Sequence, residues 1–336
     1  MTRKVLVVAV LSLLIASCGG GSEGGSRGGA TIARPLAYSL TGAETLSYHA
    51  EMETEMTAKF GEALLRLDPS MPSTMHTQME MSFDSTYTIE DGSEPGTYRV
   101  SMRLDDIDLK KGSVEMGREK VNLGDVPQRE LDAALSSQMP EFVYEIDDKG
   151  AIVSVEMDGT TIDVEGLLGG TSTAGFTGGQ MFGPQLPEGQ VNVGDSWTTS
   201  TEQTVGDVAI ETEETHKIIR REERNGHDTW VIRTDSDTSA YTISWDDMIA
   251  MYEQMGGIQN VEGMDEMPPS FQMAMRSSPT SSTMYTWLDP ELGRAVALDV
   301  ITHTAMIMEM GGIPGMNGSI SLDMDGYTHI TMELTD

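Results

Sequence analysis

The sequence predicts an α+β fold in which long antiparallel strands form one or two curved, half-barrel-like sheets, each packed against a helix. Three observations lead to this prediction. Apolar and polar residues alternate over unusually long segments. Two other segments combine helical spacing with capping residues. Gly- and Pro-rich turns separate the expected strands and helices. The 336-residue chain is long enough for one large or two medium domains with a substantial core.

A charged and then apolar segment comes first. Arg3 and Lys4 form a positive head, and the apolar run Val5–Ile15 follows. Because a membrane-spanning helix needs roughly 20 apolar residues, this run is too short to be one. Its charge, its length and the small residues after it indicate a secretory signal over residues 1–17.

The residues that end this signal, Ile15-Ala16-Ser17-Cys18, resemble the lipobox of bacterial lipoproteins. The resemblance implies that Cys18 carries a lipid and anchors the exported chain to the bacterial cell envelope, at either the inner or the outer membrane. An ordinary signal peptide cut nearby, with an unmodified thiol, is the alternative. Since Cys18 is the only cysteine, the chain has no internal disulfide and depends on its apolar core.

The charge balance limits the partners. The chain has 21 Lys and Arg against 54 Asp and Glu, a net charge of −33. Nucleic acids and anionic lipid surfaces attract basic patches, so neither is an expected partner. Solubility or a salty habitat explains such acidity, and calcium binding stays open, although Asp323-Met324-Asp325-Gly326 matches only half of a calcium loop.

The first part of the chain divides into a Gly-rich tether over 18–34 and a β-rich N-terminal half over 35–165. In this half, apolar residues recur at every second position, which is typical of strands with one wet face. A helix with Pro127 in its first turn interrupts them. The expected elements are strands at Ser47–Phe60, Thr77–Ile89 and Tyr98–Leu104, the helix Pro127–Met139, and a hairpin of Glu141–Asp147 with Ala151–Asp158.

A Gly-, Ser- and Thr-rich connecting segment over 166–189 leads to the β-rich C-terminal half over 190–336. Its helix, Ser244–Met255, begins with a capping pair of Ser244 and Asp247. Gly257–Ser282 is expected to be a loop. The expected strands are Trp197–Val205, Val208–Arg221, Thr229–Asp235, Thr283–Leu288, Arg294–Glu309 and Ser319–Leu334.

The two halves share a pattern. Phe142–Met157 and Met284–Val300 both read as an aromatic residue, Ile or Leu followed by Asp, a turn with Gly, and an apolar strand. Either the halves duplicate one structural unit, or any acidic β-hairpin gives this pattern.

Catalytic, cofactor-binding and metal-binding motifs are not evident, and we expect no enzyme. Ser196 in the segment Val193–Trp197 has no partner base and is interpreted as part of a turn before a strand. The six histidines form no metal-binding pair, and surface positions explain His216, His303 and His329 most simply.

Methionine provides the candidate binding site. The chain has 26 Met but only 6% aromatic residues, and flexible Met side chains line adaptable apolar surfaces. The expected lining of an apolar-ligand site consists of inward-facing strand residues, namely Met52, Met56, Met79, Met81, Met102, Met324 and Met332.

Two resemblances extend this interpretation. The stretch Leu186–Trp197, with its V-x-V-G-D-S-W sequence, is similar to a segment of a family of functionally uncharacterised bacterial lipoproteins, which implies no activity. The likeness to the half-barrel lipoprotein carriers LolA, LolB and LppX is one of architecture, and implies a curved sheet that holds acyl chains. The predicted function is therefore a non-enzymatic envelope lipoprotein that binds a lipid or acyl chain. The alternative is a structural or assembly lipoprotein with a filled core, which acts through an envelope protein.

Overall fold

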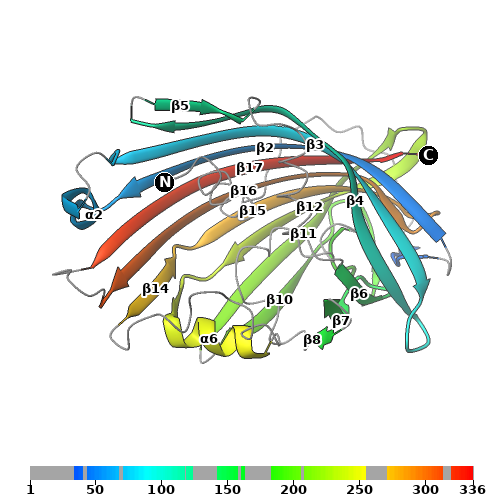
Figure 1. Cartoon of the computed structure of the whole chain (residues 1–336). Coiled ribbons are helices and arrows are strands. Elements are labelled where there is room, and N and C mark those ends of the chain that lie inside the picture. Colours follow the sequence, from blue (N-terminus) through cyan, green and yellow to red (C-terminus); the bar gives the residue numbers. More distant parts are fainter. Residues whose placement is uncertain are drawn as a thin grey trace.

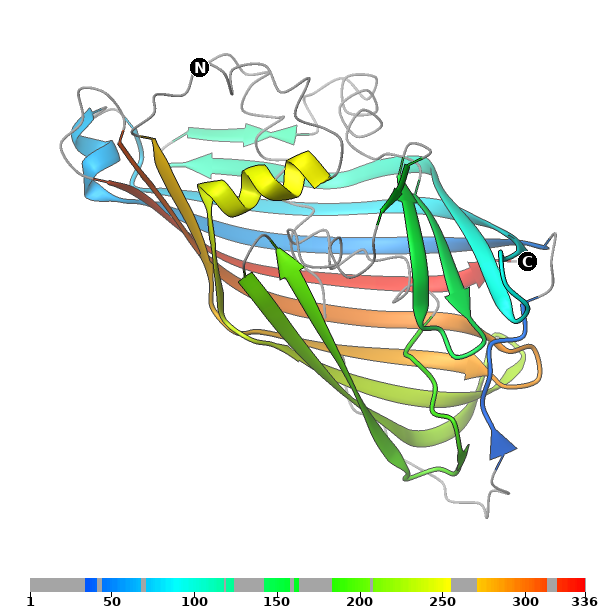
Figure 2. The same ribbon diagram turned by 90° about the horizontal axis from the view of Figure 1, so that it is seen from below.

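The structure, a computed structural model, describes residues 34–40, 44–67, 71–117, 119–123, 142–157, 160–162, 183–205, 208–254, 271–312 and 319–335. In this part of the chain, a single antiparallel sheet of 15 strands accompanies a two-stranded sheet of β1 and β9. The large sheet bends into an arch (Figure 1). Seen from below, its inner side opens toward the viewer (Figure 2).

The strands have the following bounds. Those before the connecting segment are β1 (Arg34–Pro35), β2 (Glu44–Phe60), β3 (Thr74–Asp91), β4 (Thr97–Met116), β5 (Glu119–Asn122), β6 (Phe142–Asp147), β7 (Ile152–Met157) and β8 (Thr160–Ile162). Those after it are β9 (Gln190–Val191), β10 (Ser196–Val205), β11 (Val208–Arg224), β12 (His227–Thr238), β13 (Tyr241–Ser244), β14 (Gln272–Ser277), β15 (Thr280–Asp289), β16 (Arg294–Gly311) and β17 (Ile320–Thr335).

Two short helices complete the described elements, α2 (Glu62–Leu67) and α6 (Trp245–Gln254). The predicted cap of α6 is confirmed, because the Asp247 carboxylate accepts a hydrogen bond from the Ser244 backbone N–H at 2.9 Å, and Ser244 Oγ accepts one from the Asp247 N–H at 3.2 Å. The predicted helix Pro127–Met139 lies outside the described residues.

The predicted α+β class is wrong. Strands dominate the described chain, which has only two short helices, and α6 contacts the strands β10, β13 and β14 instead of covering a sheet as a separate layer. Period-two alternation continues further than expected. The predicted loop Gly257–Ser282 contains β14, and β4 runs to Met116, well beyond the predicted Leu104. The sheet rather than a helix layer therefore dominates the architecture.

Alternation gives the sheet two different faces. On β2 the even-numbered residues Tyr48, Ala50 and Met56 are buried, whereas Glu51 and Glu55 are exposed. The alternation continues on the neighbouring strands, where the buried residues are mainly odd-numbered on β3 and even-numbered on β17, so one face is apolar and the other is acidic. The apolar face holds the main core cluster and is here called the inner face.

The strand order repeats. The long path of the sheet runs β10-β11-β12-β15-β16-β17-β2-β3-β4-β6-β7-β8, which is two sets of six strands in the same chain order, joined where β17 pairs with β2. The similar hairpins in Phe142–Met157 and Met284–Val300 supply the fourth and fifth strands of the two sets. The two sets therefore match in strand order, and both contribute to one continuous core.

Residues 34–40, here called the strap, cross one end of the arch (Figure 2). The backbone N–H of Tyr38 donates to the Asp148 carbonyl at 2.8 Å, and that of Ser39 donates to the Gly293 carbonyl at 3.0 Å. These carbonyls belong to the β6–β7 and β15–β16 turns, which hold equivalent places in the two six-strand sets. The strap therefore ties the two halves together at one end.

Candidate functional site

The predicted methionine lining lies on the inner face. Six of the seven side chains are buried, with exposed fractions of 2–8%, and Met52 is half-buried against the same core. They come from the adjacent strands β17, β2, β3 and β4, so the sheet brings them onto one continuous surface. The buried members are Met56, Met79, Met81, Met102, Met324 and Met332.

Further methionines belong to this face. Met75, Met275, Met284 and Met306 are also buried in the main core cluster. The parity of their strands could have identified Met75 and Met306. Met275 could not be found because its strand, β14, lies in the segment interpreted as a loop.

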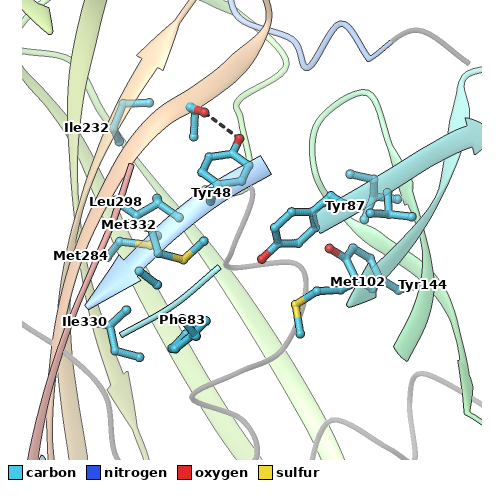
Figure 3. Close-up of a cluster of buried hydrophobic side chains, with 14 of the residues drawn as sticks. Tyr48, Phe83, Tyr87, Met102, Tyr144, Ile232, Met284, Leu298, Ile330 and Met332 are labelled. Carbon is cyan, nitrogen blue, oxygen red and sulfur yellow. Dashed lines mark hydrogen bonds between the residues drawn. The ribbon is translucent and has the colours of Figure 1, made fainter. Parts of the chain in front are cut away.

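The inner face changes character along the strands. Toward one end, the pairing register aligns Met306, Met324, Ala58, Met75 and Met116 in one row across five strands, here called the methionine row. Toward the strap, aromatic rings and branched aliphatic side chains join Met102, Met284 and Met332 on the face (Figure 3). One end is therefore lined mainly by methionine, and the other, here called the rigid end, is packed mainly by rings and branched side chains.

Tyrosines define the rigid end. Tyr48 donates its hydroxyl to the Ala295 carbonyl at 2.8 Å, and its ring meets that of Tyr87 edge-to-face at 5.4 Å (Figure 3). Tyr38 of the strap donates to the Pro184 carbonyl at 2.8 Å. Burial raises the pKa of all three phenols well above the usual range, so they stay protonated, and those of Tyr38 and Tyr48 serve as hydrogen-bond donors.

His216 is the one described histidine buried on the inner face, and its predicted surface position is wrong. Its Nε2 lies 2.8 Å from Thr199 Oγ1, its Nδ1 lies 2.9 Å from Thr234 Oγ1, and its ring stacks on Trp197 at 5.1 Å. Burial lowers the pKa of His216 to about 4. The ring is therefore neutral at pH 7, and these contacts explain it as a satisfied core residue.

The other candidate polar residues lie elsewhere. His329 and Asp299 are hydrogen-bonded at 3.0 Å on the acidic face, and the carboxylate raises the pKa of the imidazole. Asp323 is exposed there as well. Among the residues that the structure describes, no three His, Cys, Asp or Glu side chains come together as metal ligands would.

Ser196 belongs to a turn and a strand start. The Asp195 carboxylate accepts the Asn192 backbone N–H at 2.8 Å, and Gly194 has the left-handed φ of 100° that this turn requires. Ser196 then begins β10, and the indole of Trp197 donates to the Gln185 carbonyl at 2.8 Å. The motif therefore builds a tight connection into the sheet.

The predicted lipidation site, Cys18, lies outside the described residues. Within the described ranges, none of the helices has the length and apolar character needed to span a membrane.

Comparison with family models and with curated sequences gives no match. Solved structures align over most of their length at very low similarity. OccK5 (OpdH) of Pseudomonas aeruginosa is 8% identical over 88% of this chain and 100% of its own, with a TM-score of 0.22. OmpF of Salmonella typhi in complex with daunomycin is 5% identical over 86% and 98%, with a TM-score of 0.22. OccK9 (OpdG) of P. aeruginosa is 6% identical over 87% and 99%, with a TM-score of 0.20. TM-scores this low give no basis for an inference about this chain.

Proposed function

We propose that this protein is a non-enzymatic lipoprotein of the bacterial cell envelope, anchored through Cys18, that binds an apolar ligand such as a lipid or acyl chain on the inner face of its arch. The observation that carries the proposal is the continuous methionine surface of β14, β16, β17, β2 and β3. Flexible thioether side chains can repack around chains of different length and shape, which suits a variable ligand.

The lipobox-like sequence before Cys18 and the Gly-rich tether support the location. The acidic face does not favour contact with anionic lipid, so a covalent lipid is the feature that would hold the protein at a membrane. The tether then limits how far the arch can move from that membrane.

Burial of the methionines favours a second candidate. Their exposed fractions of 2–8% mean that the chain itself already covers the inner face in this structure. A structural or assembly lipoprotein with a filled core, acting on an envelope protein through its acidic face, is therefore the competing function.

Mass spectrometry distinguishes the two. The full chain is purified in mild detergent from its own kind of bacterium and weighed denatured and native. The denatured mass should show the acylated Cys18, and the native mass should include a lipid that is lost on denaturation. An acylated chain without any bound species supports the assembly role instead, and a chain without acylation contradicts the anchor.

A photoreactive fatty acid then locates the site. We expect labelled peptides from β2, β3 and β17 to carry the label on Met56, Met79 or Met324. Labelling confined to acidic-face residues such as Glu51 and Glu55 would indicate adsorption to the surface and would count against the inner-face site.

A further inference from the structure

A group of threonines interrupts the apolar inner face. Thr54, Thr77, Thr302 and Thr328, here called the hydroxyl band, have exposed fractions of 1%, 1%, 8% and 0%. Pairing sets Thr328 opposite both Thr302 and Thr54, so three of them form one row across β16, β17 and β2. Thr77, on β3, lies in the adjacent row opposite Met56.

Thr77 and the pair of Thr54 and Thr328 have unused hydrogen-bonding capacity. Thr54 Oγ1 and Thr328 Oγ1 lie 3.1 Å apart, and a bond between two hydroxyls uses only one of their two hydrogens. Thr77 Oγ1 is buried with no hydrogen-bond partner among the described residues. Ser85 Oγ and Thr286 Oγ1 are likewise buried without a hydrogen-bond partner among the described residues, but Thr77 is the one that lies beside the threonine row, where its hydroxyl is available to a ligand.

Apolar side chains flank the band on both sides. The methionine row lies on the side of Thr77, with Met324 and Met75 nearest. On the other side the next row contains Ile330, Met52 and Met81. A ligand lying along the strands would thus meet apolar surface, then hydroxyls, then apolar surface again.

The band is uncharged. The register places only neutral residues in its two rows on the described strands β16, β17, β2 and β3, namely Thr302, Thr304, Thr328, Gly326, Thr54, Met56, Thr77 and Met79. A buried carboxylate or phosphate would lack a counter-ion here, whereas a neutral carbonyl oxygen accepts a hydroxyl hydrogen without one.

We infer that the inner face takes a neutral ester lipid, an acylglycerol, whose ester carbonyl accepts a hydrogen bond from Thr77 while its acyl chains lie on the methionines to either side. This inference rests on the proposed function and adds the chemical class of the ligand.

The test compares two lipids that differ only at the ester. The full chain in mild detergent is equilibrated with dioleoylglycerol or with its diether analogue, which has the same chains but no carbonyl, and occupancy is read by native mass spectrometry. We expect the diester to bind about fivefold more tightly, the worth of one hydrogen bond. The isosteric Thr77→Val variant should lose this preference.

Two variants serve as controls. Thr77→Ser keeps the hydroxyl and should keep the preference. Thr88→Val makes the same substitution on the same strand but at an exposed position on the opposite face, and should also keep it. Thermal unfolding of each variant verifies that it is folded.

The outcomes separate the inference from the proposed function. Equal binding of diester and diether by the unmodified protein overturns the ester inference and leaves apolar binding standing. A preference that survives in Thr77→Val also overturns it, because the carbonyl then lies elsewhere. If neither lipid binds, the ester inference falls, and the native mass of the protein from its own kind of bacterium decides the proposed function separately.

Discussion

Burial of a neutral imidazole makes the stability of this protein depend on pH. His216 is fully buried, with both ring nitrogens within 3 Å of threonine hydroxyls, and its pKa falls to about 4 from an ordinary 6.5. Between these two values the unfolded chain binds a proton that the folded chain does not. Folding stability therefore decreases as the pH falls from 6.5 toward 4.

The size of the effect follows from the two pKa values. A unit of pKa difference corresponds to about 1.4 kcal/mol, so His216 alone should cost about 2 kcal/mol of unfolding free energy between pH 7 and pH 4.5. Glu214 Oε2 lies 3.7 Å from Nε2, and burial nevertheless keeps the pKa of the imidazole low.

The assay is denaturant unfolding of the full chain at pH 7 and pH 4.5, followed by tryptophan fluorescence. His216→Gln retains polar atoms for Thr199 and Thr234 but cannot titrate. Between pH 7 and pH 4.5 its free energy of unfolding should therefore fall by about 2 kcal/mol less than that of the unmodified protein. His49→Gln, an exposed histidine on the acidic face, should behave like the unmodified protein. If His216→Gln loses as much stability on acidification as the unmodified protein, the buried-imidazole argument is wrong.

Three further predictions concern other parts of the arch. Thr77→Val removes a buried hydroxyl that lacks a partner among the described residues, and should raise the free energy of unfolding by about 1 kcal/mol in the ligand-free protein. Gly293→Ala adds a Cβ that collides with the strap at a φ of 65°, whereas Gly226→Ala has a φ of 83° but open space around it. Backbone strain alone should lower the free energy of unfolding of Gly226→Ala by about 1–2 kcal/mol. Gly293→Ala should lower it further and should also speed hydrogen exchange in residues 34–40. Equal losses in the two variants would contradict a role for the strap. Asp299→Asn should lower the pKa of His329, because the Asp299 carboxylate raises it. The protonated His329 stabilises the fold at low pH, and this contribution is lost as the pH rises through its pKa. In the variant this contribution should be smaller. An NMR titration of the imidazole that is unchanged by the substitution would contradict this.

The strand pattern could be predicted because it depends on local alternation. On β2 and β17 each step of two residues returns to the same face, so Met52, Met56, Met324 and Met332 were assigned to one side from sequence alone. Their meeting on adjacent strands depends on the pairing of β17 with β2, which local periodicity does not encode. The site was thus predicted as a list of residues but not as a surface.

The fold class was wrong for a related reason. Two capped segments suggested helix layers, but in the described chain α6 has ten residues and rests beside β10, β13 and β14. Met273 and Met275 alternate with Gln272, Ala274 and Arg276 on β14, yet the Pro-Pro pair before them favoured a loop. His216 also escaped detection, because a single histidine in an alternating strand has no sequence signal that separates burial from exposure.

The junction of β17 with β2 also determines how the chain can fold. Hairpins such as β2–β3 and β16–β17 form between neighbours in sequence, but Met52 pairs with Ile330 across almost the whole chain. Contacts between such distant residues form slowly, and until they form, both strands present unpaired backbone edges that invite association with other chains. The central seam of the sheet therefore closes only after residues 320–335 have been synthesised behind residues 44–60.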